Sequence, residues 1–256
     1  MFIEILTAAA EAAPQQNAFG LKEALEQGGV IAWATFLILV TMSIFSFYIL
    51  FAKLFEQNKI MKQARDMRTN FWRAPSLREG AAKLDKNSAY RQIVDDGIKA
   101  EEAHAKLTDP VEAHDWLHGS LARSESSITN KLSGGLAFLA TVGATAPFIG
   151  LFGTVIGIYR ALIKIGLAGQ ASIDAVAGPV GEALIMTALG LAVAVPAVLA
   201  YNWLQARNKQ IASELSAFST DVLGYMASGG AVKPMAAAAP SATTKAGVAT
   251  APAAKK

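Results

Sequence analysis

Three polar side chains in otherwise apolar stretches of the chain have types that can handle protons. Glu182 carries a carboxyl group, and Thr154 and Thr187 carry hydroxyls that both donate and accept hydrogen bonds. A charged side chain near the centre of a membrane helix costs roughly 2.5–3.5 kcal/mol on insertion scales, so it should face protein or water. The three residues are therefore candidates for a proton pathway or a polar pore lining.

Each of these residues also has a purely structural interpretation. Glu182 lies near the outer end of the apolar stretch that contains it, where a carboxyl group can simply reach the lipid headgroups. A threonine in a membrane helix often bonds the carbonyl group four residues earlier. On a helical wheel Thr187 lies about 140° from Glu182, and most of the small residues of that stretch fall between them. The carboxyl and hydroxyl groups thus flank one small-residue face.

Two apolar stretches each carry a stripe of small residues at alternating steps of three and four, which keep one face of a helix. Small residues let membrane helices approach closely, so the stripes are either packing seams or faces that line a narrow conduit or seat a partner helix. Pro147 and Pro196 lie in mid-span, where a proline frees a carbonyl group and bends the helix. The first stripe comprises Gly143, Pro147, Gly150, Thr154, Gly157 and Ala161, and the second comprises Ala183, Thr187, Gly190, Ala194 and Ala197.

Other kinds of chemistry lack the residues they need. The chain has no cysteine, which excludes disulfides, thiolate metal sites and thiol nucleophiles. It has no phosphate-binding glycine loop ending in Lys-Ser or Lys-Thr and no plausibly placed Ser/His/Asp set. His114 and His118 are four apart, but no third metal ligand is patterned around them. We therefore expect no enzyme activity, cofactor or metal, and the net charge of +3 gives no indication of nucleic-acid binding.

The elements that must position these residues are membrane helices. Of the 256 residues 53% are hydrophobic and only 17% are charged, whereas soluble domains average about 25% charged residues. A helix needs about 20 apolar residues to cross the hydrocarbon core, and three stretches qualify: 29–52, 136–165 and 176–203. The first has bulky side chains on all sides and suits a lipid-facing helix, so the other two should form the inner layer of an assembly. The predicted fold class is an all-α membrane protein with three transmembrane helices extended by a cytoplasmic helical bundle.

The distribution of charge predicts the orientation. Basic residues crowd the segment after the first span, whereas Lys22 alone precedes it among four acids. By the positive-inside rule the N-terminus lies outside and the C-terminus lies in the cytoplasm. Arg160 and Lys164 weaken the rule locally, but both can reach the headgroups. The predicted parts are a periplasmic segment (1–28), a cytoplasmic helical domain (53–135), a periplasmic loop (166–175), a cytoplasmic helix (204–228) and a disordered Ala/Pro/Thr/Lys-rich tail (229–256).

Local signals divide the cytoplasmic domain into helices. Pro75 should interrupt the helix that continues the first span. Ser76 with Glu79 forms a capping-box signature for a second helix. Asp109 before Pro110 is an N-cap and N1 pair for a third.

Residues 139–158 (LATVGATAPFIGLFGTVIGI) and 178–202 (GPVGEALIMTALGLAVAVPAVLAYN) resemble the second-span and third-span signatures of the MotA/TolQ/ExbB proton channel family. MotA-type stators have four spans, so the three-span layout favours the ExbB and TolQ branches. The extended N-terminal segment, the Ala/Pro tail and the Phe152-Gly-Thr run favour ExbB, with a TolQ-type subunit of the Tol-Pal envelope system as the alternative.

The resemblance implies a homopentamer in a bacterial inner membrane whose second and third helices surround two transmembrane helices of a partner, ExbD. In this family an aspartate of ExbD carries the proton and faces threonines that match Thr154 and Thr187, while the pore glutamate matches Glu182. Glu182 would then tune the path rather than carry the proton. Proton flow would energise TonB, which opens outer-membrane receptors for siderophores and cobalamin. A passive scaffold and a solute transporter are the competing classes, although three spans without a repeat give little to build a substrate site.

Overall fold

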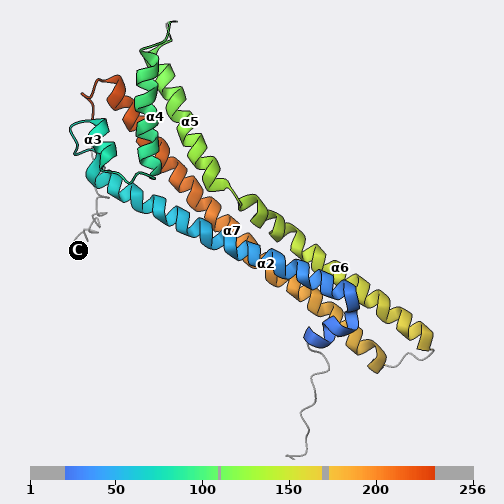
Figure 1. The fold of residues 1–256 in the computed structure, drawn as a ribbon. Coiled ribbons are helices and arrows are strands. Elements are labelled where there is room, and N and C mark those ends of the chain that lie inside the picture. Colours follow the sequence, from blue (N-terminus) through green and yellow to red (C-terminus); the bar gives the residue numbers. More distant parts are fainter. Residues whose placement is uncertain (1–20, 109–110, 169–172, 234–256) are drawn as a thin grey trace, which may run out of the picture. The chain divides into compact units, whose positions relative to one another are not determined.

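The computed structural model describes residues 21–108, 111–168 and 173–233. All the regular elements of these residues are helical, and three of the helices are long and apolar enough to cross a membrane. The predicted all-α membrane class is therefore confirmed. The elements are α2 (Leu21–Asp66), the π-helix η1 (Met67–Phe71), α3 (Leu77–Ala82), α4 (Ala89–His104), α5 (Ala113–Ser133), α6 (Leu136–Ala168) and α7 (Ile173–Ala227) (Figure 1).

Several predictions lie partly or wholly outside the described residues. These are the periplasmic segment before residue 21, the Asp109–Pro110 helix start and the tail from residue 234 onward. The helices flanking the predicted 166–175 loop reach further into it than expected, since α6 ends at Ala168 and α7 begins at Ile173. The segment 204–228 is continuous with the third apolar stretch, because α7 runs unbroken to Ala227.

A break in α2 coincides with the start of its apolar stretch. Gly29 has φ 61° and ψ −155°, a conformation that only glycine adopts without strain. The guanidinium of Arg160, on α6, donates a hydrogen bond to the carbonyl oxygen of Gly28 at this break. Just before the break Leu25 is buried in a cluster with Ala32 and Met186. Residues 21–28 therefore form a short helical arm that is fixed against α6 and α7.

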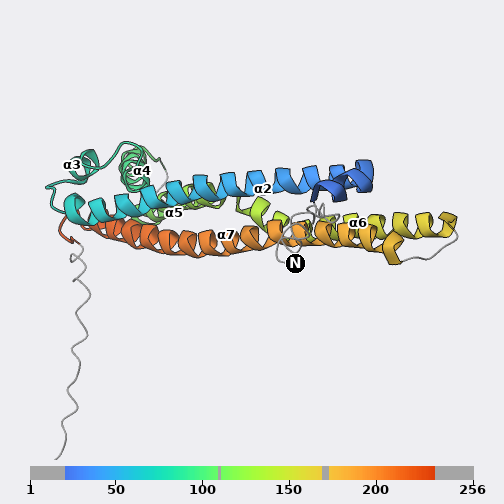
Figure 2. The same ribbon diagram turned by 90° about the horizontal axis from the view of Figure 1, so that it is seen from below.

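The chain divides into two units, of which the first comprises residues 1–59 and 129–211. This unit contains the apolar parts of α2, α6 and α7, which lie side by side (Figures 1 and 2). One buried cluster takes Leu39 from α2, Val142 and Ala146 from α6, and Ala194 and Ala197 from α7. Leu139 and Leu204, both fully buried, belong to the next cluster along the bundle. Alanines make up a large share of this core, especially on α7, so the three helices pack closely.

Side chains from α2 and α7 cap the C-terminal end of α5, where four carbonyl groups have no partner within the helix. Lys53 donates to the carbonyl oxygen of Lys131 at 2.7 Å. Asn208 donates to that of Leu132 at 3.1 Å and accepts a bond from the Gln57 amide at 2.7 Å. The chain then turns into α6 through Gly135, whose φ of 83° favours glycine. One polar network thus joins three helices at the turn between α5 and α6.

Asn208→Ala is expected to destabilise this junction. The substitution removes one of the two acceptors of the buried Gln57 amide, which also donates to the Leu204 carbonyl, and it removes the donor to the Leu132 carbonyl. A buried group left without a partner costs about 1–3 kcal/mol. Thermal unfolding of the purified protein in detergent should show a lowered midpoint. Asn202→Ala is the matched control, because Asn202 is exposed on the same helix, and an equal loss in both variants would contradict this role.

The second unit comprises residues 60–128 and 212–256 and has an aromatic core. Phe218 of α7 lies with its ring centroid 5.2 Å from both Phe71 and Tyr90. Tyr90 is fully buried, and this burial raises the pKa of its hydroxyl above the usual value. The predicted N-cap at Ser76 is confirmed, because its hydroxyl accepts a bond from the backbone N–H of Glu79 at 3.3 Å. The π-helix η1 and the helix α4 thus pack against the C-terminal part of α7.

Candidate functional site between α6 and α7

The two predicted stripes of small residues face each other across the contact between α6 and α7. A methyl group added at Gly150 would lie 2.6 Å from the carbonyl oxygen of Met186, and one added at Gly190 would lie 2.7 Å from that of Ala146. A methyl at Gly157 would lie 3.3 Å from Cβ of Ala183. The obstacles at Gly150 and Gly190 are backbone atoms, which cannot move aside as a flexible side chain does. The two helix backbones therefore touch at this point.

The next turn of the same contact carries Thr154 and Thr187. Their hydroxyl oxygens lie 2.5 Å apart and share a hydrogen bond between the two helices. The Thr154 hydroxyl also donates to the carbonyl oxygen of Ala183 at 2.8 Å, with that of Gly150 at 3.2 Å as a second acceptor. Ala183 is four residues before Thr187 and is thus the carbonyl that Thr187 would use within its own helix. When Thr154 occupies this acceptor, Thr187 can donate to the Thr154 oxygen.

This arrangement differs from that of the other threonines in the apolar helices. The hydroxyls of Thr35, Thr41, Thr141 and Thr145 each donate to the carbonyl four residues earlier in their own helix. Only about 8% of Thr154 is exposed, whereas Thr187 is half-buried. Thr154 is therefore turned toward α7, and Thr187 is the member of the pair that keeps accessible surface.

The remaining predicted site residues lie around this pair. Glu182 belongs to α7, five residues before Thr187, and its side chain is not among those that the structure describes. Gly143 lies against the side chain of Val198, further along the same contact. Pro147 is half-buried inside α6, between Gly143 and Gly150.

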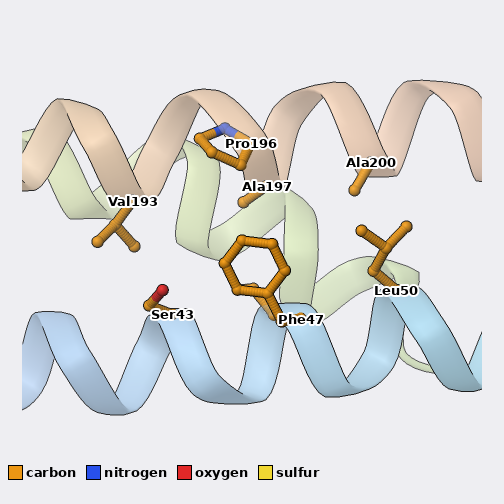
Figure 3. Close-up of a pocket in the computed structure, with 8 residues that line it drawn as sticks. Ser43, Phe47, Leu50, Val193, Pro196, Ala197 and Ala200 are labelled. Atoms are coloured by element: carbon orange, nitrogen blue, oxygen red, sulfur yellow. The ribbon is translucent and has the colours of Figure 1, made fainter.

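Pro196 lies away from the small-residue contact and toward α2. It lines a small cavity of about 10 Å³ together with Ala197 and Ala200 of α7 and with Ser43, Phe47 and Leu50 of α2 (Figure 3). The space is at the lower limit for one water molecule. The first span thus packs against the third where Pro196 frees the carbonyl of the preceding turn.

The exposed surface of this unit is strongly apolar. The most apolar window of the first span is 17% buried within the chain, against 28% and 33% for the second and third. The position of the first span in the outer layer of an assembly stays a prediction. Lipid or further protein must cover these faces. Large exposed side chains include Phe45, Phe51, Phe148, Phe152, Leu184, Leu191 and Leu199.

Sequence reasoning missed three contacts of this unit. Two of them are hydrogen bonds to backbone carbonyls, from Thr154 to Ala183 and from Arg160 to Gly28. A sequence pattern describes side chains only, so it does not indicate a backbone acceptor on another helix. The Gln57 amide was missed for a different reason, because a single glutamine after a span is an ordinary cytoplasmic residue. The available signal was its spacing. Gln57 lies seven residues, about two helical turns, before Ala64, so the two share the buried side of α2.

His114 and His118 lie in the second unit. The rings of His114 and His118 stack with centroids 6.3 Å apart. Within the described parts of the chain, no group of three His, Asp or Glu side chains is placed to hold a metal ion.

Comparison with known proteins places this bundle in a family. The model of the MotA/TolQ/ExbB proton channel family matches residues 85–217. The chain is 38% identical over 213 residues to the biopolymer transport protein ExbB of Xanthomonas campestris pv. campestris, covering 79% of this chain and 84% of that protein. It is 35% identical over 208 residues to ExbB of Neisseria meningitidis, with 79% and 94% covered. The Tol-Pal system protein TolQ of Pseudomonas aeruginosa is 30% identical over 203 residues, with 77% and 88% covered. The chain therefore belongs to the MotA/TolQ/ExbB proton channel family.

Proposed function

We propose that this chain is the ExbB-type subunit of a proton-driven energiser of the bacterial inner membrane. A homopentamer surrounds two transmembrane helices of an ExbD-type partner, and proton flow along that contact energises TonB. The energised TonB opens outer-membrane receptors for siderophores and cobalamin. The N-terminus lies in the periplasm and the C-terminus in the cytoplasm.

The observation that carries this proposal is the hydroxyl pair of Thr154 and Thr187. A proton-bearing side chain on a partner helix needs polar groups at a fixed position in an otherwise apolar wall. Thr187 offers a half-buried hydroxyl, and Thr154 holds it in place by occupying the Ala183 carbonyl. Glu182, one to two turns earlier on α7, adds an acid that tunes the charge along the path.

A second candidate function is that of a TolQ-type subunit, which serves the Tol-Pal envelope system. The 30% identity to a protein of that name favours it. The higher identities of 38% and 35% belong to proteins named ExbB, which is why we place the ExbB assignment first.

Deletion of the gene in its host tests the assignment. We expect the deletion strain to lose growth when an iron–siderophore complex is the sole iron source, and a plasmid copy of the full chain to restore it. Detergent sensitivity and filamentous cells with normal siderophore use would instead identify the TolQ-type function. Native mass spectrometry of the co-expressed complex tests the assembly, since a mass other than five copies with two partner chains would contradict the proposed stoichiometry.

A further inference from the structure

An apolar groove of about 500 Å³ runs between α2 and α6 on the outside of the first unit. Val30 and Phe148, two of its lining residues, are 83% and 70% exposed, so the groove opens sideways. The hydroxyls of its two threonines, Thr35 and Thr145, are both bonded to carbonyls of their own helices. The groove therefore presents hydrocarbon alone. Its walls include Val30, Ala34 and Ile38 of α2 and Thr145, Phe148 and Phe152 of α6.

The length of the groove matches one leaflet of a bilayer. Its α2 wall runs from Val30 to Ile38, which at 1.5 Å per residue is about 12 Å. The hydrocarbon core of a bilayer is about 30 Å thick, so one leaflet contributes about 15 Å. The α2 wall begins beside Gly28, at the start of the predicted span 29–52, and ends at Ile38, before the middle of that span.

A cation lies at the end of the groove where lipid headgroups are expected. Arg160 donates to the carbonyl oxygen of Gly28, and a methyl group on Gly29 would lie 3.2 Å from its Nη1 atom. The next residue, Val30, already lines the groove. A guanidinium has five N–H donors in a planar fork, so it can hold this carbonyl and phosphate oxygens at once.

We propose that the groove binds one acyl chain of an anionic phospholipid whose phosphate group pairs with Arg160. The apolar walls and their length of about one leaflet match the acyl chain. Arg160 at headgroup level matches the phosphate group. The bound lipid would stabilise the packing of residues 21–28 against α6, because Arg160 would contact both the lipid phosphate and the Gly28 carbonyl. This binding site is independent of the proton pathway and of the identity of the energised partner.

Native mass spectrometry of the full-length protein, equilibrated with phosphatidylglycerol and then stripped with detergent, tests this site. We expect one retained lipid per chain, and about tenfold less retention in Arg160→Gln, as expected for the loss of one charge-assisted contact. Arg160→Lys keeps the charge and should retain most of the lipid. Ala34→Phe fills the groove and should also release it. Ala52→Phe is the matched control, because Ala52 is exposed at the opposite end of the same span.

Equal retention by the wild type and Arg160→Gln would overturn the proposal. So would equal retention of phosphatidylcholine and phosphatidylglycerol, since the net charge would then play no part. If Ala34→Phe changes the oligomer mass while lipid retention stays constant, a second copy of the chain occupies the groove instead, and the lipid assignment is wrong.

Discussion

Thr154→Val is expected to abolish energised uptake while the fold and the oligomer remain intact. Valine has nearly the shape of threonine, so the packing between α6 and α7 is preserved. The substitution removes the donor to the Ala183 carbonyl and the hydroxyl that bonds Thr187. Thr187 then regains the Ala183 carbonyl as an acceptor in its own helix and turns away from its present orientation. We expect siderophore-dependent growth to fall to the level of the deletion strain.

Matched variants separate the role of this hydroxyl from a general effect of a threonine change. Thr145→Val removes a hydroxyl from the same helix that bonds only the Thr141 carbonyl in the described hydrogen bonds, and it should leave uptake unchanged. Thr154→Ser keeps the hydroxyl and should retain most of the uptake. Native mass spectrometry verifies that each variant assembles. Full uptake by assembled Thr154→Val would exclude the hydroxyl pair as part of the proton path.

The pair should also behave as one unit. If Thr154 acts by orienting Thr187, then Thr154→Val and Thr187→Val remove the same interaction. The double variant should therefore lose no more proton flux than the more severe single variant, which is the non-additivity expected of residues in contact. Proton flux into vesicles that contain the purified complex measures this directly. Independent, multiplying losses would mean that the two hydroxyls serve separate steps.

The membrane class and the small-residue faces were predictable from the sequence for a physical reason. A bilayer admits only long apolar helices, so the hydropathy of the spans determines the class, and the steps of three and four place Gly150 and Thr154 on one face. The family signatures of residues 139–158 and 178–202 add specificity to that prediction. Such periodicity does not determine how the neighbouring helix is rotated about its axis, or how far it is shifted along that axis.

The contacts that depend on register are the ones the sequence did not predict. Nothing in the pattern around Thr154 indicates that its acceptor is the carbonyl of Ala183 on another helix. The capping of Leu132 by Asn208 likewise depends on where α7 passes the end of α5. Arg160 was expected to reach the headgroups, and the structure adds its bond to the Gly28 carbonyl. The pairing of residues 132 and 28 with such distant parts of the chain arises from tertiary packing alone.

Gly190→Ala is expected to force α6 and α7 apart, although it adds a single methyl group. The new carbon would lie 2.7 Å from the Ala146 carbonyl oxygen and 3.1 Å from Cα of Gly150, so backbone would have to move. Overpacking of a tight core typically costs about 1–3 kcal/mol. Because the displacement also separates Thr154 from Thr187, the variant should lose both thermal stability in detergent and energised uptake.

Gly166→Ala provides the matched control for this contact, since among the described residues a methyl group at Gly166 in α6 would have no atom within 4 Å beyond its own helix backbone and chain neighbours. Alanine favours a helix interior over glycine by about 1 kcal/mol, so Gly166→Ala should be neutral or slightly stabilising. Gly190→Ala gains at least as much helix propensity, because Gly190 lies in the middle of α7 whereas Gly166 is in the last turn of α6, so a loss of stability in Gly190→Ala alone is due to the clash. If both variants unfold at the same temperature and support equal uptake, the close approach of the two backbones is not required for stability or function.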